Sequence, residues 1–97
     1  TILYFTKIKN MIEKFKNYLI DNGYSDLTPT GKPSTATDYS NRIKRICRRE
    51  NIKLNELAKN IDFYVEDYGP EGNNSEYGKK SNNAYISALK QFKNFLG

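Results

Sequence analysis

Apolar residues that recur every three or four positions constrain this fold more than any other feature of the sequence. In residues 8–22, the side chains of Ile8, Met11, Phe15 and Leu19 follow this spacing, which places them on one face of a helix. Three later segments repeat the spacing, and no segment alternates apolar and polar residues convincingly enough to predict a half-buried strand. The sequence therefore predicts an all-α fold, a compact four-helix bundle over residues 8–22, 34 or 35 to 50, 55–68 and 81–96.

Residues that favour helix ends separate these four segments. Gly23 and Asn51 tolerate the left-handed backbone conformation that commonly ends a helix, and Asn55 is a suitable N-cap for the third helix. Gly69, followed by a proline, ends the third helix. The glycine- and asparagine-rich segment that follows, residues 69–83, is predicted to be a flexible loop.

One hydrophobic core is expected, because 97 residues suit a single domain. Phe95 and Leu96 are expected to face the same core at the C-terminal end of the last helix. The predicted core consists of the apolar residues on the inner faces of the four helices: Phe15, Leu19, Tyr39, Ile43, Ile46, Leu57, Ile61, Val65, Tyr85, Leu89 and Phe92.

Charge is segregated between the predicted helices. Residues 34–53 carry six basic and two acidic side chains, and residues 79–97 carry four basic and no acidic ones. Residues 54–78 carry one basic and six acidic side chains. The second and fourth helices are therefore basic and the third is acidic, a distribution that favours an acidic partner such as nucleic acid.

The basic residues of the second helix point away from its buried stripe. Arg42, Arg45 and Arg49 lie on one flank of the helix, and Lys44 and Arg48 lie opposite the buried stripe. The outward face of the fourth helix adds amide and hydroxyl groups to its lysine. Arginine and lysine suit phosphates and guanine edges, and asparagine and glutamine suit adenine, so these faces are candidates for DNA contact.

Several kinds of site are disfavoured by the residues that the chain lacks. There is no histidine, and Cys47 is the only cysteine, so a zinc site of ordinary ligand spacing is excluded. No phosphate-binding glycine motif follows a strand. No catalytic residue, metal or cofactor is predicted, and Cys47 is interpreted as a small hydrophobe beside the core.

The order of motifs resembles the core-binding domain of tyrosine recombinases of the phage-integrase type. That domain opens with a helix reading F-x-x-Y-L, followed by a G-x-S-x-x-T turn and a helix with a tyrosine one turn in. Its last helix resembles "NNAYISALKQFKNFLG", and the similarity covers roughly residues 10–97. The matching residues of the first part are Phe15, Tyr18, Leu19, Gly23, Ser25, Thr28 and Tyr39.

The resemblance implies a four-helix, SAM-like orthogonal arrangement that clasps duplex DNA, with the second and fourth helices at the major groove. It implies partners in double-stranded DNA and in other recombinase protomers, with no membrane and no small-molecule substrate. It also implies a bacterial or phage protein of the cytoplasm, associated with the nucleoid. The expected DNA-binding residues are Arg42, Lys44, Arg45, Arg48, Arg49, Lys79, Lys80, Asn83, Ser87, Lys90, Gln91 and Asn94.

Within this set, six side chains are expected to line one surface: Arg42, Arg45, Arg48, Arg49, Lys90 and Asn94. The chain lacks an initiator methionine, and we expect a fragment of a longer recombinase whose catalytic domain lies downstream. By itself the fragment is then not an enzyme.

Four other interpretations compete with the recombinase interpretation. The basic faces could simply be solvated, or the chain could be a helical protein-interaction module whose acidic third helix meets basic helices of a neighbouring copy. A small enzyme would need a nucleophile and base or metal ligands, which the composition disfavours. A helix-turn-helix repressor is disfavoured because the third helix, which would enter the groove, is the acidic one.

Overall fold

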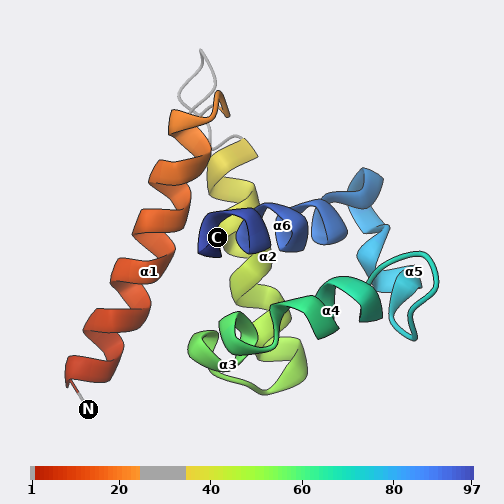
Figure 1. Ribbon diagram of the computed structural model, residues 1–97, viewed down its shortest axis with the longest axis horizontal. Helices are drawn as coiled ribbons and strands as arrows, with labels where there is room; N and C mark the ends of the chain where they lie inside the picture. The colour runs from red at the N-terminus through yellow and green to blue at the C-terminus, as the bar shows by residue number, and fades with distance from the viewer. Residues whose placement is uncertain (1, 25–34) are drawn as a thin grey trace.

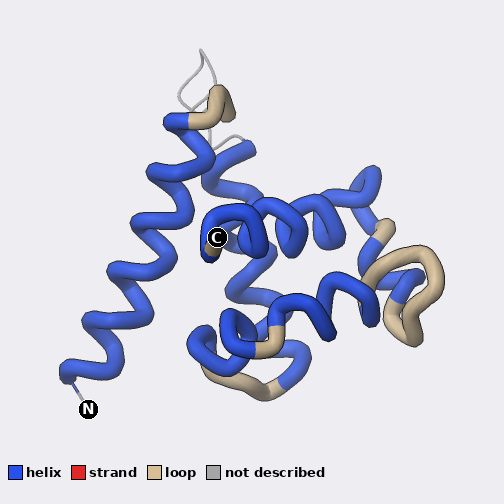
Figure 2. The backbone as a smooth tube through the Cα atoms, in the orientation of Figure 1, coloured by secondary structure: helices blue, strands red, loops and turns tan. Residues whose placement is uncertain are grey.

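A computed structural model of the chain describes residues 2–24 and 35–97. This part contains no strand, which confirms the all-α class (Figure 2). The predicted turn residues Ser25 and Thr28, and the alternative helix start at Ser34, lie outside the described residues. The described helices are α1 (Ile2–Asp21), α2 (Thr35–Glu50), α3 (Leu54–Lys59), α4 (Ile61–Asp67), α5 (Ser75–Gly78) and α6 (Lys80–Leu96).

The two predicted left-handed helix ends are confirmed. Gly23 has φ +96°, and the amide of Tyr24 donates to the carbonyl of Leu19 at 2.9 Å. Asn51 has φ +56°, and the amide of Ile52 donates to the carbonyl of Cys47 at 3.0 Å. In both cases the backbone turns back on the last turn of the helix and satisfies carbonyls that the helix itself leaves free.

The third predicted helix is divided into two, α3 and α4. Asn60 lies between them with φ −114° and ψ 29°, and its side-chain amide donates to the carbonyl of Glu56 at 3.1 Å. The backbone amide of Asn60 donates to the same carbonyl at 3.1 Å, so the break lies in the backbone angles of Asn60. The predicted N-cap was also wrong, because Lys53 precedes the first helical residue and Asn55 lies inside α3.

Residues 69–83, predicted to be a loop, contain α5 and the beginning of α6. Gly78 explains how α5 fits, because a Cβ at this position would lie 1.9 Å from the carbonyl oxygen of Tyr68. Only a glycine allows this approach without displacing the backbone. Ser81 and Asn83 have φ of +56° and +65°, so α6 becomes regular only after Asn83.

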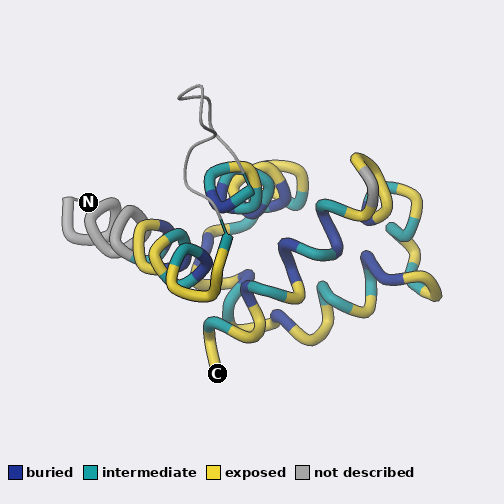
Figure 3. Tube along the Cα trace, turned by 90° about the horizontal axis from the view of Figure 1, so that it is seen from above, coloured by how far each residue is buried: buried dark blue, intermediate teal, exposed yellow. Residues whose placement is uncertain are grey.

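The core is close to the predicted one. Tyr39 and Val65 are half-buried and pack against it, whereas every other predicted core residue is buried. Leu96 is 39% exposed, so its predicted core position was wrong. Phe95 instead makes the aromatic contacts at that end of α6. Figure 3 shows buried positions recurring along the helices with exposed positions between them. The largest fully buried side chains are Tyr68, Phe15, Phe92, Leu19, Ile43, Ile46, Leu57 and Leu89.

Helix α6 crosses α2, and these two helices pack more extensively than any other pair (Figure 1). Helix α1 packs on both of them, and α4 and α5 pack on α6. Side chains from the end of α4, from α5 and from the first turns of α6 meet one flank of α2, where Arg49 contacts Tyr68 and Tyr77 and Arg42 contacts Tyr85. This arrangement positions the candidate site.

Candidate nucleic-acid interface

Three arginines on one flank of α2 meet tyrosines from the other side of the fold. The guanidinium carbon of Arg42 lies 5.4 Å from the centre of the Tyr85 ring, and that of Arg49 lies 4.1 Å from the centre of the Tyr77 ring. Arg45 lies close enough to Tyr85 for the tyrosine hydroxyl to raise the pKa of the guanidinium group. A cation over an aromatic face is attracted by the electron density of the ring. The predicted flank is therefore a set of packed cation–aromatic pairs.

The tyrosines form a row that joins three elements. Tyr68 follows α4, Tyr77 lies in α5 and Tyr85 lies in α6. The centres of the Tyr68 and Tyr77 rings are 5.8 Å apart, and those of Tyr77 and Tyr85 are 4.6 Å apart. Lys80 lies over the Tyr77 ring at 5.0 Å. We call Arg42, Arg45, Arg49, Lys80, Tyr68, Tyr77 and Tyr85 the arginine–tyrosine cluster.

Arg49 has the most partners in the arginine–tyrosine cluster. Its Nε donates to the Tyr68 hydroxyl at 3.2 Å, and its Nη2 donates to Oδ1 of Asn74 at 2.9 Å. The Tyr68 hydroxyl donates in turn to Glu50 at 2.6 Å, and the amide of Asn74 donates to Asp67 at 2.6 Å. Two carboxylates therefore lie behind the two groups that hold Arg49.

The electrostatics of the cluster reflect its excess of cations. Burial raises the pKa of Tyr85, but the hydrogen bonds with Tyr77 and Arg45 and the charges of Arg45 and Arg42 lower the pKa by more. The net result is a Tyr85 pKa below its usual value. The hydrogen bond with Tyr85 raises the pKa of Arg45. Negative charge is therefore stabilised at Tyr85, beside Arg42 and Arg45, whereas burial raises the pKa of Tyr77 and of Tyr68.

Arg42 is the least accessible cation of the cluster. Its side chain is only 16% exposed, and it lies 4.0 Å from the carboxylate of Asp38. Its Nε is buried without a hydrogen-bond partner among the described residues. The sequence places Arg42 on an outer flank, but it does not reveal that Asp38 and Tyr85 lie close to its guanidinium group.

Lys44 and Arg48 are exposed on α2, as expected for residues opposite its buried stripe. Within the described part of the chain, no hydrogen bond or ion pair engages either side chain. They extend the positive surface of α2 away from the tyrosines.

The predicted residues of α6 separate into two groups. Lys80 joins the cluster, whereas Lys90 lines a surface cavity beside α4 and Asn94 is exposed near the end of the helix. Nine residues separate Tyr85 from Asn94, which corresponds to about 14 Å along a helix. The structure therefore does not bring Lys90 and Asn94 to the arginine–tyrosine cluster.

The remaining predicted residues lie around the first turns of α6. Lys79 pairs with Glu76 at 3.1 Å, and it lines a small cavity of about 160 Å³ together with Asn83. Ser87 and Gln91 are half-buried. Their contact with DNA stays a prediction.

Sequence reasoning missed the aromatic and amide partners of the arginines. Tyr85 was assigned to the core, whereas Tyr77 and Asn74 fall in the segment predicted as a loop. The signal that was available is the presence of Tyr77 and Tyr85 among the lysines and asparagines of residues 74–85.

The acidic side of the molecule carries a surface cavity of about 570 Å³. Phe63, Glu66, Asp67, Glu71 and Lys90 are among its lining residues. Phe63 is 62% exposed. An ion pair of 2.8 Å between Lys93 and Asp62 joins α6 to α4 nearby.

The thiol of Cys47 is expected to react slowly with iodoacetamide in the folded protein. Burial, with a smaller contribution from the charge of Glu56, raises the pKa of Cys47 to about 11. Because the thiolate is the reactive form, the native rate should rise about tenfold for each pH unit from pH 8 to pH 10. In urea, which unfolds the protein, the rate should stop rising once the pH exceeds the ordinary cysteine pKa of about 8.5. Alkylation followed by mass spectrometry measures both profiles, and a native plateau near 8.5 would contradict the burial of this thiol.

Comparisons with protein-family models, with curated proteins and with solved structures gave no match to this chain. In the part of the chain that the structure describes, no group of three or more His, Cys, Asp or Glu residues could hold a metal ion. No helix in the same part combines the length and apolar character needed to cross a membrane.

Proposed function

We propose that this chain binds duplex DNA and is the SAM-like core-binding domain of a tyrosine recombinase. The order of motifs in the sequence supports this proposal, and so does the position of the two basic helices, which pack directly on each other. In the proposed four-helix arrangement, α3 and α4 together take the place of the third helix. The catalytic residues of a recombinase would then belong to another domain.

The observation that carries DNA binding is the convergence of Arg42, Arg45, Arg49 and Lys80 on Tyr77 and Tyr85. Phosphates attract such a surface because binding releases the counterions that are condensed on DNA. The nearby carboxylates of Glu50 and Asp67 accept hydrogen bonds from Tyr68 and Asn74, so both are already occupied by neutral donors. Phosphate contacts should dominate over base contacts.

Titration of a labelled duplex at several salt concentrations tests this proposal. The expected dissociation constant is about 10⁻⁴ to 10⁻⁶ M at physiological salt. If three or four cations contact phosphates, the slope of log affinity against log salt should be about −3 to −4. Absence of binding at about 50 mM salt, where such contacts are strongest, would contradict the proposal.

A second candidate function is a protein-interaction module that binds a second copy of the chain. The observation that favours it is the cavity with exposed Phe63 and the acidic residues Glu66 and Glu71. The exposed Lys44 and Arg48 of another copy are complementary to this cavity in charge. Such a contact joins different faces of the two copies.

Charge reversal distinguishes this second candidate. Self-association in sedimentation velocity should be lost in Glu66→Lys/Glu71→Lys and also in Lys44→Glu/Arg48→Glu. Mixing the two variants should restore a heterodimer, because each retains one intact face. A wild-type chain that stays monomeric at millimolar concentration and low salt would exclude this function.

A further inference from the structure

Arg49 presents one edge of its guanidinium group to the protein and leaves the other edge open. Nε and Nη2 form the lateral edge, and both donate to acceptors of the protein, the Tyr68 hydroxyl and Oδ1 of Asn74. One face of the group stacks on the Tyr77 ring. The end-on edge, formed by Nη1 and the second hydrogen of Nη2, makes no hydrogen bond within the described residues, and Arg49 is exposed. Two parallel N–H donors therefore remain available.

Each of the two acceptors is itself oriented by a carboxylate. The Tyr68 hydroxyl gives its proton to Glu50, so its oxygen is free to accept from Arg49. The side-chain amide of Asn74 gives a hydrogen to Asp67, which turns Oδ1 toward Arg49. The Arg49 guanidinium is thus fixed in position and rotation before any ligand arrives. Fixing a group in advance lowers the entropy that binding would otherwise cost.

We propose that the end-on edge of Arg49 binds one phosphodiester of the DNA backbone through two parallel hydrogen bonds, and that Tyr68 and Asn74 are its positioning residues. This inference rests on the proposed DNA-binding function. Phosphate fits the edge because two of its oxygens match the spacing of the two donors. A guanine edge offers a similar pair of acceptors, so the experiment must separate the two. The cations Arg45 and Lys80 beside the same tyrosines favour the phosphate.

The decisive variant is Arg49→Lys, which keeps the charge and removes the fork of donors. It should bind duplex DNA about tenfold more weakly than wild type, while the slope of log affinity against log salt stays unchanged. The control is Lys59→Arg, which also keeps the charge, at an exposed lysine of α3 away from the cluster. This control should bind within about twofold of wild type.

A double-mutant cycle tests the positioning role. Asn74→Ala should weaken binding several-fold alone, but Arg49→Lys/Asn74→Ala should bind no more weakly than Arg49→Lys. If the losses of binding free energy in the two single variants add up in the double variant, Asn74 does not act through Arg49. Thermal unfolding of each variant should show that the fold is retained.

Two duplexes, one of A·T pairs and one of G·C pairs, separate phosphate from guanine. If Arg49 contacts a phosphate, Arg49→Lys should reduce the affinity for both duplexes by the same factor. A loss confined to the G·C duplex would overturn the phosphate assignment. If wild type binds DNA and Arg49→Lys binds equally well, this inference alone fails. If wild type binds no duplex, the proposed function fails and this inference fails with it.

Discussion

Replacing Phe92 by alanine is expected to lower the free energy of unfolding by about 3–5 kcal/mol, through lost transfer energy and the cavity left behind. Phe92 is fully buried in α6, and its ring meets the edge of Phe15 of α1 with the ring centres 5.1 Å apart. It also lies 5.9 Å from Phe95. The side chain therefore helps to attach the long α1 helix to the rest of the core, and neighbouring rings cannot fill the space without losing their own contacts.

Urea denaturation followed by circular dichroism measures this change. Phe63→Ala is a matched control, because it removes the same ring from a position that is 62% exposed. It should change the stability by less than about 0.5 kcal/mol. Equal effects of the two substitutions would contradict the orientation of α6 in this fold.

The sequence predicts those features of the helices that depend on neighbouring residues alone. The apolar spacing identified the inner faces of α2 and α6, and Gly23 and Asn51 marked helix ends because left-handed residues are a local property. The break at Asn60 was not predictable, since the apolar spacing continues from Leu57 through Ile61 across it. The break lies in the backbone angles of Asn60, which the apolar spacing does not report.

Helix α5 was missed for a different reason. Residues 69–83 are rich in glycine and asparagine, which locally favour a loop. The close approach of Gly78 to the Tyr68 carbonyl is a tertiary contact, so it has no local signature. Tertiary packing overrides propensity in such segments.

The candidate site was predictable only on the side of α2. Helical geometry put Arg42, Arg45 and Arg49 on one flank, and the structure keeps them together. Their tyrosine partners come from three other elements, whose relative positions no spacing rule gives. For the same reason the sequence grouped Lys90 and Asn94 with the arginines, although Lys90 lies beside α4.

Removal of two cluster arginines is expected to have the largest effect on DNA binding. Arg45→Ala/Arg49→Ala eliminates two exposed guanidinium groups that lie against Tyr85 and Tyr77. If each contacts a phosphate, affinity should fall by about tenfold or more per arginine, as for a hydrogen bond to a charged group. The slope of log affinity against log salt should become less steep by about 0.9 for each arginine.

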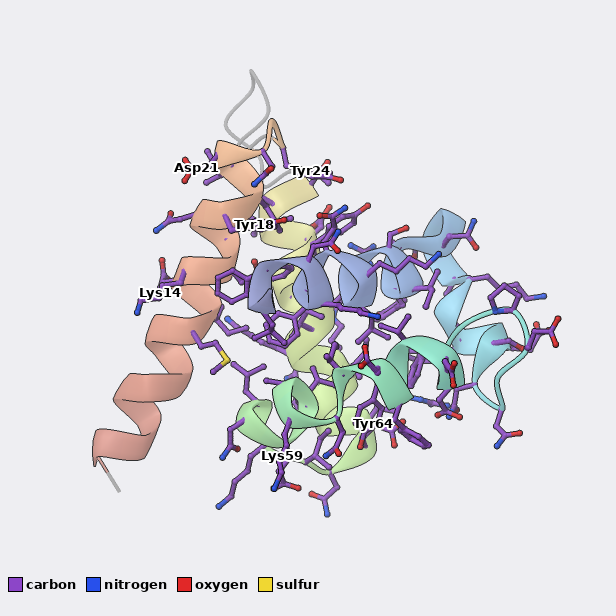
Figure 4. All side chains as sticks on the ribbon, viewed as in Figure 1. Lys14, Tyr18, Asp21, Tyr24, Lys59 and Tyr64 are labelled. Carbon is purple, nitrogen blue, oxygen red and sulfur yellow. The ribbon has the colours of Figure 1, made fainter. Side chains whose placement is uncertain are left out.

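A charge-matched control is available far from the cluster. Lys14 and Lys59 are exposed on α1 and α3, as the labelled side chains in Figure 4 show. Lys14→Ala/Lys59→Ala removes the same formal charge without touching the tyrosine row. Its effect on affinity should stay below about threefold, because distant exposed charges are screened by salt.

Fluorescence anisotropy tests DNA binding at the arginine–tyrosine cluster most directly. A labelled duplex is titrated at several salt concentrations with wild type, with Arg45→Ala/Arg49→Ala and with Lys14→Ala/Lys59→Ala. If DNA binds at the arginine–tyrosine cluster, only the arginine variant should bind more weakly than wild type. Its slope of log affinity against log salt should be less steep by about 1.8. Equal behaviour of the two variants, or an arginine variant that binds as wild type does, would contradict binding at this cluster.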